Sequence, residues 1–402
     1  MKVIRFQAAL MAFFLAATLS AQEANAPAFG KGLFNLVGQD SSWTMKVGLR
    51  FQFLTTLDWT ENAAGSLADP STNFLIRRSR LKFDGYAFSP KLEYKIELGL
   101  SNRDMSGASE FTRNSPRFVM DAVVKWNFYE NFVLWAGQTK LPGNVERVIS
   151  SGDLQLVDRS LLNSTFNIDR DIGFQLRHHT MLTNSFLIRE ILAFSQGEGR
   201  NVTQGNQGGH KYTARLELLP FGAFTKDSEY SGADLVREPA PKLMLASSYD
   251  YNDDAVRTRS NLGSYMFTDT GLFQTPIKTL FVDAVFKYRG FSFMGEYADR
   301  KADDPIALNS DGSPTGDVVA VGNGLNLQAG YLTAKNWEVA GRYTHIELDE
   351  TVTGAAPLSQ YTLGLSRYFS GHKLKVQTDI SYLDAVAGSD ELMYRLQLDL
   401  HF

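Results

Sequence analysis

Apolar and polar residues alternate along most of the chain. In residues 45–53 every odd position is apolar, and every even position is charged, polar or glycine. The same two-residue period returns at 92–100, 212–218, 325–331 and 374–382. Because successive side chains of a strand point to opposite faces, this pattern predicts strands that have one apolar face and one hydrated face.

About sixteen such windows follow one another, each about ten residues long, which is the length that crosses a bilayer when a strand is tilted. Long and short connections alternate, except that 221–240 is long where a short turn is expected. Outer-membrane barrels show this asymmetry, with tight periplasmic turns and extended outer loops. The predicted strands begin near residues 44, 74, 91, 117, 131, 171, 184, 210, 241, 278, 290, 324, 335, 359, 372 and 392.

The hydrated faces decide between a soluble sandwich and a membrane barrel. In a sandwich the apolar faces meet inside and the charged faces lie on the surface. Here Glu93, Lys95 and Glu97 place opposite charges close together on one face, as expected for a water-filled lumen. A closed barrel also leaves no exposed sheet edge. We therefore predict an all-β, antiparallel transmembrane barrel of about sixteen strands that occupies residues 44–402.

The beginning of the chain has the pattern of an export signal. Lys2 and Arg5 precede a stretch without charge, whose apolar part is too short to span a bilayer and ends in small residues. We predict a signal peptide over residues 1–21 and a periplasmic N-terminal segment over residues 22–43. The mature protein is then expected in the periplasm or in the bacterial outer membrane.

The last residues support the outer membrane. Apolar side chains occupy every second position from Tyr394 to Leu400, and the chain stops on Phe402. An amphipathic strand that ends on an aromatic residue resembles the assembly signal of outer-membrane barrels. We therefore expect the barrel-assembly machinery and outer-membrane lipid as partners of this protein.

Composition excludes several other classes. The 402 residues include no cysteine, which excludes a disulfide framework, a thiolate metal site and a cysteine nucleophile. A formal net charge of −4 gives no basic field for nucleic acid. The histidines show no metal-ligand spacing beyond one adjacent pair. We expect neither a metal nor a cofactor, and no enzymatic activity.

Three segments carry a more specific resemblance. Residues 74–85, which contain an Arg-Arg pair, resemble the second strand of the phosphate-selective porin O/P family, and residues 142–151 are similar to the inward-folded third loop of that family. The ending 393–398 resembles its last strand. The resemblance implies a homotrimer of sixteen-stranded barrels, each with its own anion-conducting pore. It also implies that residues 140–170 form a constriction loop.

The resemblance also assigns candidate anion-binding residues. A guanidinium group stays charged and offers forked donors to oxyanions, and rings of Arg or Lys are the usual anion filter. Arg77 can reach the lumen only if a bulge or the strand end reorients it, because it is adjacent to Arg78. The residues that match family positions at or near the constriction are Arg50, Arg77, Arg78, Arg147, Ser150, Ser151 and Arg159.

The chain departs from the family pattern in ways that bear on selectivity. Arg147 stands where the family usually has lysine, and Asp121 follows Met120 where the family has an acidic pair. The entry loop keeps Arg257 and Arg259 from a longer run of arginines. A shorter run weakens the capture of anions from outside, which favours diffusion of small anions, phosphate included, over strict phosphate selection.

Three functions are compatible with these observations. The predicted one is passive diffusion of inorganic phosphate or other small anions through a water-filled pore narrowed by arginines. The second is a general, non-selective porin or one for larger solutes. The third is a structural barrel, sealed by its loop, that serves as a subunit of a larger surface complex.

Overall fold

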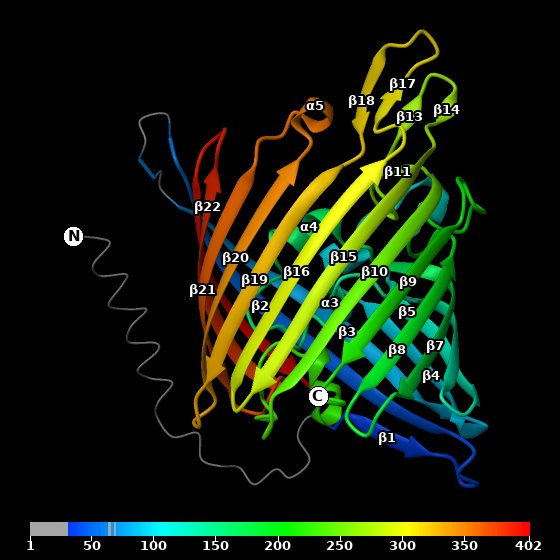
Figure 1. Cartoon of the computed structure of the whole chain (residues 1–402), viewed down its shortest axis with the longest axis vertical. Coiled ribbons are helices and arrows are strands. Elements are labelled where there is room, and N and C mark those ends of the chain that lie inside the picture. The colour runs from blue at the N-terminus through cyan, green and yellow to red at the C-terminus, as the bar shows by residue number, and fades with distance from the viewer. Residues whose placement is uncertain (1–30, 63–65, 68–69) are drawn as a thin grey trace.

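A computed structural model describes residues 31–62, 66–67 and 70–402, so the predicted signal peptide lies outside the described residues. Sixteen long antiparallel strands form a closed barrel, because β2 pairs with both β3 and β23 (Figure 1). They are β2 (Thr44–Thr60), β3 (Ser71–Ala87), β4 (Ser89–Gly99), β5 (Val119–Tyr129), β6 (Phe132–Lys140), β7 (Arg170–Met181), β8 (Leu187–Ser195), β9 (Lys211–Leu219), β10 (Lys242–Ala255), β15 (Thr275–Tyr288), β16 (Phe291–Ala302), β19 (Gly322–Leu332), β20 (Trp337–Leu348), β21 (Leu358–Tyr368), β22 (Leu374–Ala385) and β23 (Glu391–His401).

The strand prediction is confirmed, and so is the direction of the two faces. In β9, Lys211, Thr213 and Glu217 are buried, whereas Tyr212 and Leu216 are exposed. Polar side chains therefore point into the ring and apolar side chains point out, the reverse of a soluble protein. This arrangement suits a barrel that is surrounded by lipid and encloses water.

The two ends of the barrel differ, as the connection lengths predict. At one end, here called the short-turn end, tight turns join strands such as β15 and β16, and β1 (Phe34–Val37) pairs with the first residues of β2. At the opposite, long-loop end, α2 (Asn102–Met105), η1 (Glu110–Thr112) and α5 (Glu350–Thr353) lie in the loops. The hairpins there are β11 (Arg257–Arg259) with β12 (Leu262–Tyr265), β13 (Phe267–Thr268) with β14 (Gly271–Leu272), and β17 (Ile306–Leu308) with β18 (Pro314–Val318) (Figure 1). None of the helices in the described ranges is long and apolar enough to cross a membrane.

The segment between β6 and β7, residues 141–169, contacts strands that lie far apart in the ring. The Nη1 of Arg50 on β2 donates to Ser151 Oγ at 2.6 Å, and the backbone N–H of Val157 donates to Asp379 on β22 at 3.0 Å. The backbone N–H of Glu146 donates to Glu296 on β16 at 2.8 Å. One segment can reach all three strands only from inside the ring.

Apolar contacts hold this segment against one side of the interior. Its two short helices, α3 (Val145–Val148) and α4 (Leu161–Phe166), bury Val145 in a cluster with Val285 of β15, and Phe166 in a cluster with Phe281 of the same strand. The inner face of β15 therefore carries Phe281 and Val285 beside polar residues such as Lys287, since part of this face packs against the helices instead of water.

The segment 221–240, which is long where a short turn is expected, also enters the barrel from the short-turn end. It contains η2 (Thr225–Tyr230), and its backbone carbonyls accept hydrogen bonds from Lys287 Nζ on β15. The backbone N–H of Gly232 donates to Asp153 O at 2.7 Å, so this segment also contacts residues 141–169. The extra length is explained because the segment packs inside the barrel instead of making a turn.

Candidate functional site

A cavity of about 660 Å³ lies between the inner wall of strands β3 to β7 and the segment 141–169. Its lining is strongly basic, with thirteen Arg or Lys side chains against five carboxylates. The basic residues are Arg77, Arg78, Arg80, Lys95, Arg103, Lys125, Lys140, Arg147, Arg159, Arg170, Arg177, Arg200 and Arg259. The cavity therefore carries a net positive charge that attracts anions.

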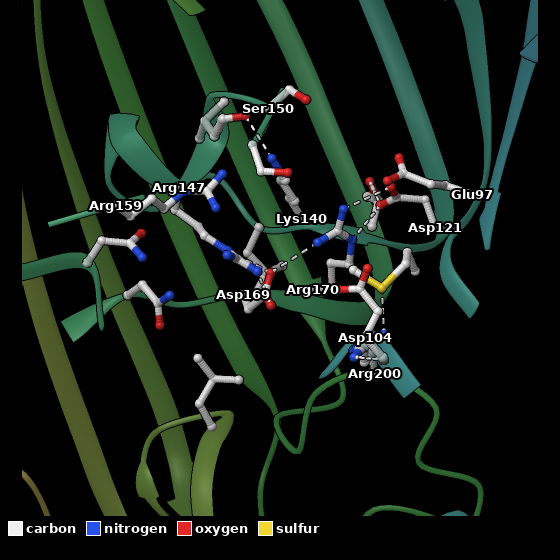
Figure 2. Close-up of a pocket in the computed structure, with 18 of the residues that line it drawn as sticks. Glu97, Asp104, Asp121, Lys140, Arg147, Ser150, Arg159, Asp169, Arg170 and Arg200 are labelled. Atoms are coloured by element: carbon white, nitrogen blue, oxygen red, sulfur yellow. Dashed lines mark hydrogen bonds and ion pairs between the residues drawn. The ribbon is translucent and has the colours of Figure 1, made fainter. Parts of the chain in front are cut away.

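Seven of these cations contact carboxylates. Arg170 on β7 binds Asp121 at 3.0 Å, and Lys95 on β4 contacts the same Asp121 at 2.7 Å. Within the segment 141–169, Arg147 Nε donates to Asp169 Oδ1 at 2.8 Å (Figure 2). These pairs hold the wall and the segment 141–169 in place, and they cancel part of the charge.

Six cations of the lining have no carboxylate partner within the described part of the chain: Arg103, Lys140, Arg159, Arg177, Arg200 and Arg259. Lys140 Nζ donates to the carbonyls of Val148 and Ile149 at 3.0 and 3.1 Å. Arg103, on α2, is exposed, and its guanidinium group makes no hydrogen bond to any described residue. Backbone carbonyls orient a cation but leave its charge, so these six account for the positive field of the cavity.

A β-bulge turns two consecutive arginines into the cavity. Gln52 of β2 pairs with Arg78, whereas the next residue of β2, Phe53, pairs with Ile76, so Arg77 is the extra residue. Both guanidinium groups are buried beside Asp158, which contacts Arg77 directly and Arg78 at 3.6 Å. The bulge supplies the reorientation that Arg77 requires to reach the lumen.

Electrostatics keep two carboxyl groups of the segment 141–169, those of Asp158 and Asp169, ionised. Burial opposes ionisation of Asp158, but the charges of Arg77 and Arg78 outweigh it and hold its pKa well below the usual value. The pKa of Asp169 is likewise held well below its usual value, against burial, by Arg147 and Arg170. The cavity therefore keeps these ion pairs throughout the neutral and mildly acidic range.

The structure brings most of the predicted site residues together and leaves two apart. Arg50 is buried, binds Asp399 through Nε at 3.0 Å and donates to Ser151, but it does not line the cavity. Arg257 donates to the carbonyl of Gly263 at 3.0 Å and closes the β11–β12 hairpin, also away from the cavity. The predicted residues that line the cavity are Arg77, Arg78, Arg147, Ser150, Ser151, Arg159 and Arg259.

Sequence reasoning missed eight basic residues of the lining. Arg80, Lys95 and Lys125 share the hydrated faces of their strands, so strict alternation could have identified them. Lys140 lies at the end of β6, and Arg103 and Arg200 lie in connections, where alternation predicts nothing. The remaining two, Arg170 and Arg177, stand on the same strand at positions of opposite parity, so no single periodicity selects both.

The residues that the structure describes contain no group of three or more His, Cys, Asp or Glu side chains that could hold a metal ion. The site is instead a charged, open cavity in a barrel whose outer surface is apolar. Together these features define an outer-membrane porin.

Comparisons with known proteins identify the family. The chain belongs to the phosphate-selective porin O and P family, whose model matches residues 46–385. An uncharacterized protein of Aquifex aeolicus (strain VF5) is 23% identical over 358 residues, which are 82% of this chain and 81% of that protein.

Solved structures share the fold at low sequence identity. An anion-selective porin from Comamonas acidovorans superposes with a TM-score of 0.56 at 13% identity, covering 89% of this chain and 100% of the porin. The trimer form of OmpT, an outer membrane protein of Vibrio cholerae, has a TM-score of 0.50 at 13% identity and covers 88% of this chain and 99% of its own. These likenesses confirm the barrel fold, and membership of a porin family indicates the bacterial outer membrane as its location.

Proposed function

We propose that this porin allows passive diffusion of small anions, inorganic phosphate among them, through a pore that the segment 141–169 narrows. The observation that carries the proposal is the cavity lining, where six basic side chains have no carboxylate partner in the described residues. Their charge would favour anions over cations at every level of the cavity.

The chemistry of the narrow region suits oxyanions. Arg147 and Arg159 from the segment 141–169 line the same cavity as Arg77 and Arg78 from the opposite wall. Guanidinium groups offer paired donors to phosphate or carboxylate oxygens, and the hydroxyl of Ser150 can replace part of a hydration shell. Because Asp158 and Asp169 already bind three of these arginines, moderate anion preference fits the lining better than tight phosphate binding.

We also propose that the protein is a homotrimer that reaches the membrane through the barrel-assembly machinery. The trimer form of the Vibrio cholerae protein supports such an assembly on this fold. Chemical cross-linking of detergent-extracted protein should give a species of three chains, and a single-chain species at all cross-linker concentrations would contradict this.

Reversal potentials test the proposed selectivity. The purified full-length protein is inserted into a planar bilayer between unequal KCl solutions. We expect a potential of the sign that chloride permeation produces, and a cation-selective potential would overturn the proposal. In liposomes, unlabelled phosphate should compete with uptake of labelled phosphate. Uptake without discrimination would instead indicate a general porin, and no uptake a structural barrel.

A further inference from the structure

A tryptophan faces the cavity near the short-turn end of the barrel. It lies closer to that end than the arginines that we predict to narrow the pore. Trp135 of β6 lies opposite Lys125 of β5 and Gln175 of β7 in the strand register. The guanidinium carbon of Arg177 lies 3.8 Å from the centre of the Trp135 ring, and Lys125 Nζ lies 4.5 Å from it. All three side chains line the cavity.

The two cations at this indole retain unused hydrogen-bond donors. Arg177 uses Nε and Nη2 for Gln175 Oε1, at 3.3 and 2.8 Å, and within the described residues its Nη1 makes no hydrogen bond. Lys125 Nζ makes no hydrogen bond in the same part of the chain, and the carboxylate oxygen of Glu93 that it contacts is 3.6 Å away. An aromatic face stabilises cations without cancelling their charge. Trp135 therefore allows two cations to lie close together while both can still bind an anion.

This part of the lining also offers apolar surface. Val123 and the ring of Tyr230 line the cavity with Trp135. A small inorganic anion would use only the two cations. A ligand that uses the cations and the apolar surface together carries a carboxylate on a flat, apolar body.

We propose that Lys125, Trp135 and Arg177 form a second binding site, separate from the constriction, for aromatic carboxylates. The carboxylate accepts hydrogen bonds from Lys125 Nζ and Arg177 Nη1, and the ring packs against the stacked guanidinium and the neighbouring aromatic side chains. The inference rests on the proposed function, since an aromatic carboxylate must first enter an anion-conducting pore.

Inhibition of chloride current by benzoate tests this site. Benzoate and acetate carry the same charge, so the difference between their half-inhibitory concentrations isolates the contribution of the ring. In the full-length wild-type channel, benzoate should inhibit at a clearly lower concentration than acetate. In Trp135→Leu the half-inhibitory concentration of benzoate should rise about threefold, which is the effect expected from the loss of one aromatic contact. The half-inhibitory concentration of acetate should stay unchanged.

Two further variants control the experiment. Trp135→Phe keeps an aromatic ring and should restore most of the benzoate inhibition. Trp126→Leu removes the neighbouring tryptophan of β5, which pairs with Leu134, is 51% exposed and points to the lipid, and it should change nothing.

Three results would overturn the site. They are equal inhibition by benzoate and acetate in the wild type, an unchanged benzoate effect in Trp135→Leu, and a loss of the same size in Trp126→Leu. Failure of the proposed function can be distinguished from failure of this site. It would appear as cation selectivity in the KCl gradient before any benzoate is added.

Discussion

The two sides of the barrel interior use the same basic residue types in opposite ways. On the side of β15 to β23, cations are enclosed by backbone carbonyls of the packed segments and by carboxylates of neighbouring strands. Lys287 is fully buried and gives its three N–H donors to the carbonyls of Ser228, Ser231 and Ala233. On the side of β3 to β7, cations border the cavity, and the side chains of Arg103 and Lys125 make no hydrogen bond in the described chain.

The difference shows what makes a lumen cation functional. A cation whose donors are all used by buried carbonyls or carboxylates supports the fold, because removing it leaves those groups without partners. A cation at the cavity with spare donors can bind a passing anion instead. Burial and hydrogen bonding separate the two roles, and charge by itself does not.

The largest effect is expected on the enclosed side, from Arg395→Gln. Arg395 binds Asp379 through Nε at 2.6 Å and Nη2 at 3.0 Å, and both residues are buried. Leaving Asp379 as an unpaired buried charge should lower the free energy of unfolding by about 3–5 kcal/mol, with no change in anion selectivity. Urea unfolding followed by circular dichroism measures the loss. Adding Asp379→Asn should recover part of the stability, and a shift in the reversal potential would contradict the division between the two sides.

The second largest effect is expected from Asp158→Asn, which acts on the two arginines at the β-bulge. This change removes the carboxylate that contacts Arg77 and Arg78 and leaves their charges uncompensated in the cavity. Anion preference should rise about twofold, as expected for one charge acting over about 10 Å in water, while stability falls. Reversal potentials in unequal KCl measure the change. A decreased anion preference would show that these arginines do not face the conducted ions.

A smaller effect is expected from Arg103→Gln. Arg103 is exposed at the cavity and its side chain has no hydrogen-bond partner among the described residues, so the free energy of unfolding should change by less than about 0.5 kcal/mol. Anion preference should nevertheless decrease, by up to about twofold. Lys301→Gln is the matched control, because Lys301 carries the same charge outside the cavity with a side chain 76% exposed. Equal effects of the two changes would mean that only the net charge of the protein matters.

The smallest effect is expected from acidification. The pKa values of Asp158 and Asp169 are held low by arginines, so both groups stay ionised when the pH falls from 7 to 5. Because their pKa values are lower in the folded than in the unfolded chain, the stabilisation is present above about pH 4 and is lost only below it. Anion preference should therefore remain constant over this range. A rise in anion preference as the pH falls towards 5 would show that these carboxyl groups take up protons in this range.

Part of the site could be predicted from the sequence. The Arg-Arg pair identified Arg77 and Arg78, and the need for a bulge followed from their adjacency, since neighbouring strand residues point to opposite faces. Arg50 shows the limit of such reasoning. It lies on the hydrated face as predicted, but Asp399 and Ser151 enclose it, and these partners are distant in the chain.

The sequence by itself determined the barrel, its sixteen strands and the direction of their faces, because alternation is a local property that each strand carries independently of the others. Only the tertiary structure decided which half of the lumen is filled and which is open. That depends on where the segments 141–169 and 221–240 pack, and their contacts join residues more than a hundred positions apart, such as Val157 with Asp379 and Gln155 with Ser292. Contacts of that range leave no periodic trace in the chain, so the cation-lined cavity appears only once the barrel is closed around them.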